Sequence, residues 1–199
     1  VLSKKYGATD LQEMIIALSK FFRISLNNGA EMLTLEQELE QIKAYMYLQK
    51  VRYRDSFDIV ITLPDELSQY SICKLTLQPL VENCINHAFT DMDETGHIEL
   101  AVSKQGEYII ITVSDNGPGG TANIKELNRQ VKRAFDPEEP IEKYGIHNVN
   151  QRIQLYFGKD CGLFYQKNEP TGLTAVVKIR AVKKSPAETI QKRRENNHD

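Results

Sequence analysis

Several features that would reveal the function of a chain at once are missing from this sequence of 199 residues. No apolar run reaches the roughly 18 to 20 residues of a membrane-spanning helix, and the first residues show no secretory signal pattern. Neither a GxGxxG nor a GxxxxGK[ST] motif occurs, so a bound nucleotide would not be held by a P-loop. The formal net charge of −2 gives no broad basic surface, and we expect no nucleic-acid partner.

Cysteine is scarce as well. Cys73, Cys84 and Cys161 form no CxxC pair and have no histidine at metal-ligand spacing. We therefore expect buried thiols in a reducing cytosol rather than a disulfide or a metal site. Hydrophobic residues make up 41% of the chain and charged residues 26%, which is ordinary for a globular protein. The length fits one large domain, or one domain with an added helical piece.

The first part of the chain shows two helical patterns joined by a short polar loop. Thr9 with Gln12, and Thr34 with Gln37, have the spacing of capping boxes at helix starts. Apolar residues recur at helical spacing after each of them. Residues 1–55 are therefore predicted to form a helical hairpin. Its stripes are bulky enough to pack against further helices, including those of a second subunit, whereas a solvated arm is the alternative.

From residue 56 onward, strand patterns alternate with helical ones. Strands are predicted at 57–63, 97–104, 107–114, 163–166 and 173–182, and helices at 75–89, 124–135 and 146–157. Strands that pair mostly with their neighbours, under helices on one face, make a two-layer α/β sandwich with a mixed, mostly antiparallel sheet over residues 56–182. The long polar connection 121–142 is typical of a lid or a binding loop. Residues 183–199 lack periodicity and are predicted to be a disordered tail or linker.

The stretch LTLQPLVENCINHAF, residues 75–89, is predicted to be one helix with two contrasting arcs. One arc is apolar, and the other carries Pro79, Glu82, Asn83, Asn86 and Thr90. A solvated arc normally carries lysine and glutamate, so these amides fit a ligand site as well as they fit a surface helix. The carbonyl oxygen of Asn83 is a hard ligand suited to Mg²⁺, and Glu82 beside it can act as a base.

Two glycine-containing segments add to this picture. In DNGPGG, Asp115 leaves a strand end, and Gly117 and Gly119 let the backbone approach a flat ligand. A buried carboxylate there can accept a hydrogen bond from the exocyclic amine of adenine, although the same residues also form a plain turn. In YGIHN, the helix amides behind Gly145 suit phosphate oxygens, and Arg152 adds charge one turn later.

The order of these pieces resembles the ATP-binding domain of the GHKL superfamily, which contains histidine kinases, gyrase, heat-shock protein ninety and mismatch-repair ATPases. Within it the chain is similar to sensor histidine kinases of the LytS/YesM type. LQPLVENCINHAF resembles their LQPLVENAIKHG, and LEQELEQIKAYMYLQKVRY resembles their LEEELE.IKAYL.IQ..RY. The resemblance extends from about Leu11 to Val182 and implies the GHKL, or Bergerat-like, sandwich preceded by the hairpin.

The resemblance implies roles for the residues of an ATP site. Asn83 would hold Mg²⁺, with Glu82 as the candidate base and Asn86 and His87 lining the same helix. Asp115 would bind the adenine amine. The first glycine box would be Gly117 and Gly119, and Gly172 and Thr174 would line the adenine side. The second box, which closes on the phosphates, would comprise Lys143, Gly145, Ile146, His147 and Asn148, with Arg152 beyond it.

Two departures from the family pattern matter. The second box usually reads GxGLxN, and Lys143 stands at its first glycine. The acceptor histidine, in a stretch like PHFLYN, is absent, since His87, His97, His147 and His198 have other contexts. The acceptor is therefore expected upstream of Val1, in a larger receptor.

The implied reaction transfers the γ-phosphoryl group of ATP, with Mg²⁺, to that histidine and then to an aspartate of a response regulator. This stretch alone would bind ATP but not phosphorylate itself. Residues 1–55 would be part of the dimerisation and phosphoacceptor region of a homodimer. The chain would be a cytoplasmic domain of a bacterial inner-membrane protein, attached to the membrane only through upstream segments.

Two other classes remain open. A gyrase-like or mismatch-repair ATPase would carry a glutamate one turn before the metal-binding asparagine, where this chain has Pro79. A degenerate GHKL module would bind nucleotide or a partner without turnover, and Lys143 keeps that alternative open.

Overall fold

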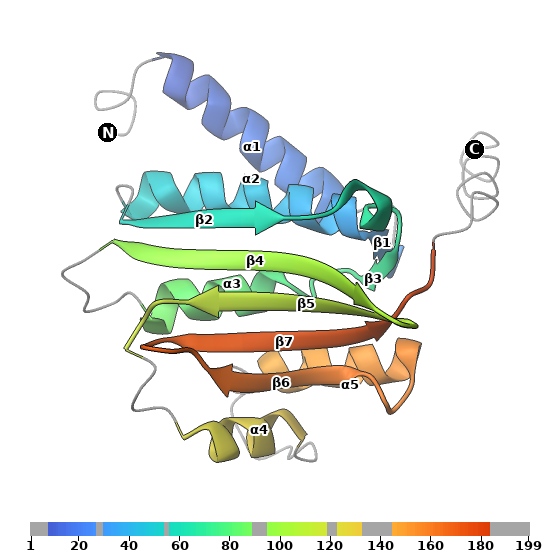
Figure 1. Cartoon of the computed structure of the whole chain (residues 1–199). Coiled ribbons are helices and arrows are strands. Elements are labelled where there is room, and N and C mark those ends of the chain that lie inside the picture. The colour runs from blue at the N-terminus through green and yellow to red at the C-terminus, as the bar shows by residue number, and fades with distance from the viewer. Residues whose placement is uncertain are drawn as a thin grey trace, which may run out of the picture.

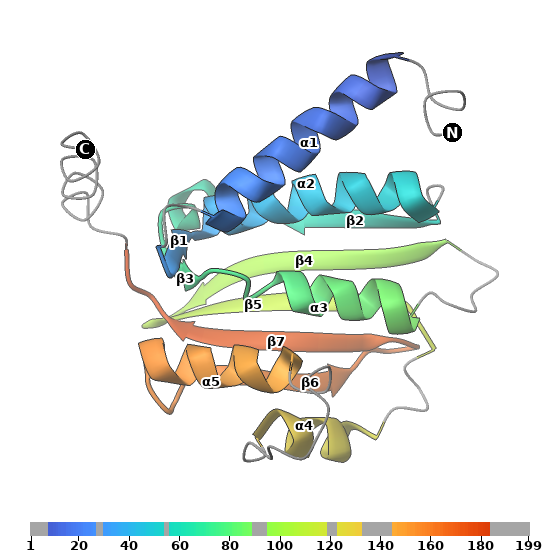
Figure 2. The same cartoon turned by 180° about the vertical axis from the view of Figure 1, so that it is seen from behind.

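The structure is a computed structural model that describes residues 8–26, 30–53, 56–88, 95–118, 123–132 and 145–183. These residues form two layers, a five-stranded sheet and a layer of helices on one of its faces (Figures 1 and 2). The predicted two-layer α/β sandwich is therefore confirmed. The expected tail falls almost wholly on residues 184–199, which lie outside the described residues.

The sheet has the strand order β2-β4-β5-β7-β6. Its strands are β2 (Phe57–Thr62), β4 (Gly96–Gln105), β5 (Tyr108–Asp115), β6 (Gly162–Lys167) and β7 (Leu173–Arg180). The β2–β4 pair is parallel, whereas β4–β5, β5–β7 and β6–β7 are antiparallel. The sheet is thus mixed and mostly antiparallel, as predicted. The antiparallel order brings the end of β5 and the start of β7 to the same edge, with Ser114 opposite Thr174.

The helical layer lies behind the sheet in Figure 1 and in front of it in Figure 2. It contains α2 (Leu35–Tyr53), α3 (Gln78–Asn83), the π-helical turn η4 (Cys84–Ala88) and α5 (Gly145–Phe157). The short helix α4 (Ile124–Lys132) packs beside β6, and α1 (Ala8–Leu26) packs on α2 to form the predicted hairpin. A single 3₁₀ turn, η3 (Asp65–Leu67), follows β2.

The capping box at the start of α2 forms as predicted. The backbone N–H of Thr34 donates to Oε1 of Gln37 at 3.0 Å, and the N–H of Gln37 donates to Oγ1 of Thr34 at 3.2 Å. The other predicted capping box, Thr9 with Gln12, does not mark the helix start, because α1 begins at Ala8, one residue before Thr9. Each bond at the α2 start satisfies an amide that has no intrahelical partner, so the start of α2 is fixed at Leu35.

Three details differ from the sequence prediction. The central helix begins at Gln78 rather than at the predicted residue 75, since Leu75 has a φ of 57° and cannot belong to an α-helix in that conformation. The helix also changes to π geometry from Cys84. Two strands of three residues each, β1 (Met32–Thr34) and β3 (Ser71–Cys73), pair antiparallel. They are too short for a periodic pattern, so the sequence did not predict them.

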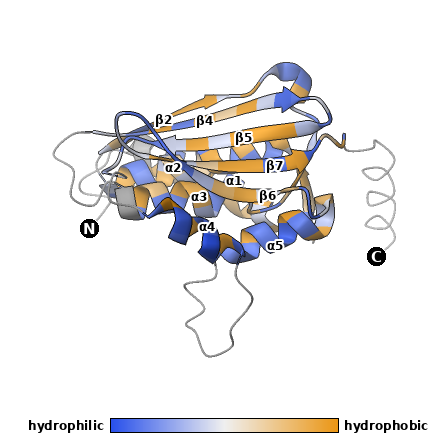
Figure 3. Cartoon of the chain, turned by 60° about the horizontal axis from the view of Figure 1, so that its bottom comes forward, coloured by the Kyte–Doolittle hydropathy of each residue, from blue (hydrophilic) through white to orange (hydrophobic). Residues whose placement is uncertain are grey.

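One hydrophobic core joins the sheet to the helices. Alternate residues of β4 and β5 face the helical layer, and Figure 3 shows the hydrophobic strands of the sheet above the helices. The apolar stripe predicted on α2, which comprises Leu35, Leu39, Ile42 and Met46, is buried in the same core. In the part of the chain that the structure describes, no helix combines the length and apolar composition of a membrane span.

We predict that Ile42→Ala lowers the free energy of unfolding of the whole domain by about 2–5 kcal/mol, because truncation leaves a cavity in this shared core. Ile42 is fully buried, whereas Ile16 of α1 is 58% exposed and serves as the matched control. Urea denaturation of the two alanine variants measures the difference. Equal, small losses for both would show that α2 is not part of the cooperative unit.

Candidate functional site

The candidate site lies where β5 ends and β7 begins, beside α3. Asp115 is the last residue of β5, and its Oδ1 accepts hydrogen bonds from the N–H of Gly117 at 2.9 Å and of Leu173 at 3.3 Å. Burial raises the pKa of this half-buried carboxyl, while the two backbone amides and the Cys84 thiol lower it. The carboxylate is thereby oriented by both neighbouring chain segments, without a cationic partner among these contacts.

Gly172 makes this arrangement possible. Its φ is +99°, and a Cβ built there would lie 1.9 Å from the carbonyl oxygen of Asp115. No residue with a side chain fits this approach, which holds the start of β7 against the end of β5. The predicted site residues Asp115 and Gly172 are therefore adjacent in the structure.

Asn168 connects the same two segments, the end of β5 and the start of β7, which we call the Asp115 corner. No motif in the sequence indicated this residue. Its Nδ2 donates to the carbonyl oxygens of Asp115 at 3.0 Å and Leu173 at 3.2 Å. Its Oδ1 accepts a hydrogen bond from the hydroxyl of Thr174, which also bonds Ser114 Oγ at 2.8 Å. Thr174 is buried, and Asn168 connects it to the backbone of Asp115.

Asn83 faces the same end of the sheet from α3. Its half-buried side chain hydrogen-bonds to Tyr165 of β6. Burial raises the pKa of the Tyr165 phenol, and the nearby Asp115 contributes to that rise. The thiol of the next residue, Cys84, donates to the carbonyl oxygen of Leu80 at 3.3 Å and lies near enough to Asp115 for the two groups to affect each other's pKa, while burial raises the pKa of the thiol. The structure thus brings the Asn83–Cys84 turn and Asp115 together, with Tyr165 beside them.

Glu82 lies on the other side of α3. Gln78 Nε2 donates to Glu82 Oε1 at 2.7 Å, and Tyr45 of α2 hydrogen-bonds to the same side chain. The carboxylate therefore contacts the hairpin rather than the Asn83–Asp115 side. Asn86 is exposed, and the side chain of His87 lies outside the described residues.

The start of α5 supplies the remaining predicted residues. Gly145 and Asn148 are exposed, Ile146 is half-buried against the core, and His147 is buried. Among the residues that the structure describes, nothing lies within 4 Å of a Cβ built at Gly145, so their packing does not require glycine there. Gly119 and Lys143, which complete the two predicted glycine boxes, lie outside the described residues, whereas Gly117 is buried.

Arg152 points to the loop before α3. Its Nη2 donates to the carbonyl oxygen of Leu75 at 2.9 Å, and its charge acts on the buried carboxyl of Glu38. Part of its hydrogen-bonding capacity is thus committed within the protein, which the sequence alone did not indicate.

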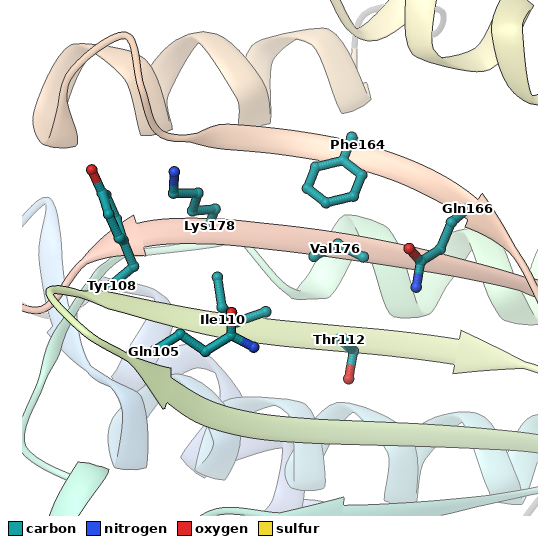
Figure 4. A pocket seen from close by; sticks show the side chains of 8 residues that line it. All are labelled: Gln105, Tyr108, Ile110, Thr112, Phe164, Gln166, Val176 and Lys178. Atoms are coloured by element: carbon teal, nitrogen blue, oxygen red, sulfur yellow. The ribbon is translucent and has the colours of Figure 1, made fainter.

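The described residues contain no cluster of three His, Cys, Asp or Glu side chains arranged for a metal ion, and Cys73, Cys84 and Cys161 are free and buried. A hollow of about 510 Å³ lies on the opposite, outer face of the sheet (Figure 4). It is lined by Gln105, Tyr108, Ile110, Thr112, Phe164, Gln166, Val176 and Lys178. None of the predicted site residues lines it, so this hollow and the Asp115 corner are separate features.

We predict that Gly172→Ala destabilises the domain by about 3 kcal/mol or more, because the new Cβ would meet the Asp115 carbonyl and strain the backbone. Gly106 in the β4–β5 turn is the matched control, since its φ is +60° but a Cβ there meets nothing within 4 Å. Gly106→Ala should lose only about 1–2 kcal/mol. Thermal unfolding compares the two, and equal losses would contradict the close approach at Gly172.

Two protein-family models match this chain. A family model of histidine kinases matches residues 1–57, and the model of histidine kinase-, DNA gyrase B- and HSP90-like ATPases matches residues 72–183. The sensor protein LytS of Staphylococcus epidermidis is 38% identical over 159 residues, covering 79% of this chain and 26% of LytS. The sensor histidine kinase YesM of Bacillus subtilis is 28% identical over 178 residues, covering 89% of this chain and 29% of YesM.

Solved structures show the same fold at low sequence identity. Histidine kinase ThkA, solved in complex with the response regulator protein TrrA, superposes with a TM-score of 0.54 at 14% identity. The match covers 84% of this chain and 48% of that chain. This chain spans between a quarter and a third of the length of LytS and YesM. Asp115, Gly172 and Asn83 thus stand in a chain that belongs to the histidine kinase-, DNA gyrase B- and HSP90-like ATPase family, among the LytS/YesM-type sensor histidine kinases.

Proposed function

We propose that this chain is the ATP-binding catalytic region of a two-component sensor histidine kinase. The observation that carries the proposal is the Asp115 carboxylate, which two backbone amides orient beside the close approach at Gly172. An oriented, partly buried acceptor of this kind suits an exocyclic amine and repels the carbonyl oxygen of a keto base. It therefore supports adenine, rather than guanine, as the base.

Asn83 is the proposed Mg²⁺ ligand. It lies on the Asp115 side of α3, and its amide is half-buried and within reach of the site. Mg²⁺ commonly takes only one or two protein oxygens and fills its shell with water and phosphate oxygens, so one amide fits the ion. When bound, the ion neutralises charge on the phosphates. The helix start at Gly145–Asn148, with Lys143, is proposed to bind the phosphates through backbone amides and charge.

The phosphoryl acceptor is proposed to be a histidine upstream of Val1, and an aspartate of a response regulator is proposed to accept the group afterwards. The relation to LytS and YesM, and the complex of ThkA with TrrA, support this assignment. A neutral imidazole needs little activation near neutral pH. Glu82 faces the hairpin, which supports a role as base toward an acceptor on the hairpin side rather than at the metal.

The hairpin is proposed to form a homodimer. One side of α1 exposes apolar residues at spacings of three and four: Leu11, Ile15, Leu18, Phe22 and Leu26. Their exposed fractions range from 40% to 71%, and such a stripe is typical of a helix that packs against another helix. The intact protein would then be a membrane receptor with this region in the cytoplasm.

A degenerate module that binds nucleotide or a partner without turnover is the second candidate. Lys143 favours it, because that position is the first glycine of the family's second box. Turnover by a longer protein separates the two functions.

We predict that a longer chain carrying the residues before Val1 incorporates label from [γ-³²P]ATP with Mg²⁺. Asn83→Ala should reduce the rate of incorporation by at least about a hundredfold, because the loss of a metal ligand removes charge stabilisation from the transferring phosphoryl group. Gln105→Ala, an exposed amide on the opposite face of the sheet, is the matched control. Acid-labile, base-stable label identifies phosphohistidine. Nucleotide binding without incorporation would favour the degenerate module, and an unaffected Asn83→Ala variant would overturn the metal assignment.

A further inference from the structure

A buried carboxylate of α2 holds the loop that leads into the helix carrying Asn83. Glu38 is 1% exposed. Its Oε1 accepts hydrogen bonds from the N–H of Thr76 at 2.9 Å and of Leu77 at 3.0 Å, and its Oε2 accepts one from the N–H of Leu75 at 3.1 Å. One side chain of the hairpin thus binds three consecutive amides immediately before α3.

These amides have few other ways to be satisfied. They lie just ahead of the first turn of α3, where backbone N–H groups have no intrahelical acceptor, and Thr76 and Leu77 are fully buried. Leu75 also has a positive φ of 57°, which is unfavourable for a residue with a side chain unless the surroundings enforce it. Two hydrogen bonds enforce that conformation: Glu38 accepts from the N–H of Leu75, and Arg152 donates to the Leu75 carbonyl oxygen.

The charge of Glu38 is poorly solvated. Burial raises its pKa to about 7, although the three amides and the Arg152 charge favour the ionised form. The charged and titratable groups that face it are Arg152 of α5 and Cys73 of β3. Ionised, the carboxylate accepts all three hydrogen bonds, whereas a protonated carboxyl has a hydroxyl that cannot accept as strongly. The contact therefore depends on the charge state of one side chain.

A second connection links the hairpin to α3. Gln41, one turn after Glu38 on α2, donates through Nε2 to Ser25 Oγ of α1 at 2.9 Å and to Gln78 Oε1 at 3.1 Å. Gln78 in turn donates to Glu82, the residue before Asn83. Both helices of the hairpin are thus connected to the same short helix, whose α-helical part has only six residues.

We propose that Glu38 is a positioning residue, which through its three amide bonds sets the position of α3 and hence of the Asn83 side chain in the nucleotide site. A displacement of α2 that withdraws this carboxylate would weaken Mg-ATP binding. This inference rests on the proposed ATP-binding function, and it makes the hairpin a regulator of the nucleotide site as well as a dimerisation element.

The test compares Mg-ATP affinity of this chain and three variants by calorimetry. Glu38→Gln keeps the shape but replaces one acceptor oxygen with an amide that repels a backbone N–H, so affinity should fall about tenfold or more. Glu36→Gln, on the exposed side of the same helix, should bind within about twofold of the parent. Ile42→Val, buried one turn away, should lower the unfolding midpoint without changing affinity by more than about twofold.

A pH series separates positioning from mere packing. The affinity ratio of the parent to Glu38→Gln should be largest near about pH 8 and approach one near about pH 6, because only the parent loses a charge there. Protonation of ATP affects both chains equally and cancels in the ratio. A ratio that stays constant over this range would overturn the proposal.

Two further outcomes would also overturn it, namely parent-like binding by Glu38→Gln and an equal loss of affinity in Ile42→Val. If the parent chain binds Mg-ATP and Glu38→Gln binds it with the same affinity, this inference alone would be overturned. A parent chain that binds no Mg-ATP would overturn the proposed function, and this inference with it.

Discussion

The close approach of two backbone segments at Gly172 is the constraint on which the site depends. The start of β7 lies so near the carbonyl of Asp115 that a Cβ would be 1.9 Å from its oxygen. That proximity lets the Leu173 amide reach the Asp115 carboxylate, while Asn168 bonds the carbonyls of Asp115 and Leu173. The orientation of one carboxylate thus follows from the packing of two strands, which in turn requires the absence of a side chain at Gly172.

The helix above this corner has too little intrinsic stability to position itself. The α-helical part of α3 has six residues and no side-chain cap of its own, and it continues into a π-helical turn. Its position comes from its neighbours: the hydrophobic core beneath it, Glu38 and Gln41 of α2, and Arg152 of α5. Because α2 belongs to the same core as the sheet, a change in the hairpin and a change in the nucleotide site are physically connected.

Much of this fold could be predicted from the sequence, because periodicity and turn residues agree with each other. All five strands of the sheet, both long N-terminal helices and the Thr34–Gln37 capping box were predicted in this way. The grouping of Asp115 with Gly172 in one site was instead implied by the resemblance to the GHKL superfamily. Contacts between residues far apart in the chain leave no such pattern. Asn168, the three amides bound by Glu38, the turn of Glu82 toward Tyr45 and the Arg152–Leu75 contact all depend on how elements pack. The positive φ of Leu75 carries no glycine signal either, which explains the misplaced start of α3.

The most direct measurement is a calorimetric titration of this chain with ATP and with GTP, each with and without Mg²⁺, repeated with Asp115→Asn. If the Asp115 carboxylate accepts a hydrogen bond from the adenine amine, ATP binds and GTP does not. The Asp115→Asn variant then loses at least about tenfold in ATP affinity. Asp58→Asn, an exposed carboxylate on β2, should leave the affinity unchanged. Equal binding of ATP and GTP, or an Asp115→Asn variant that binds ATP as tightly as the parent, would contradict the assignment of this corner as an adenine site.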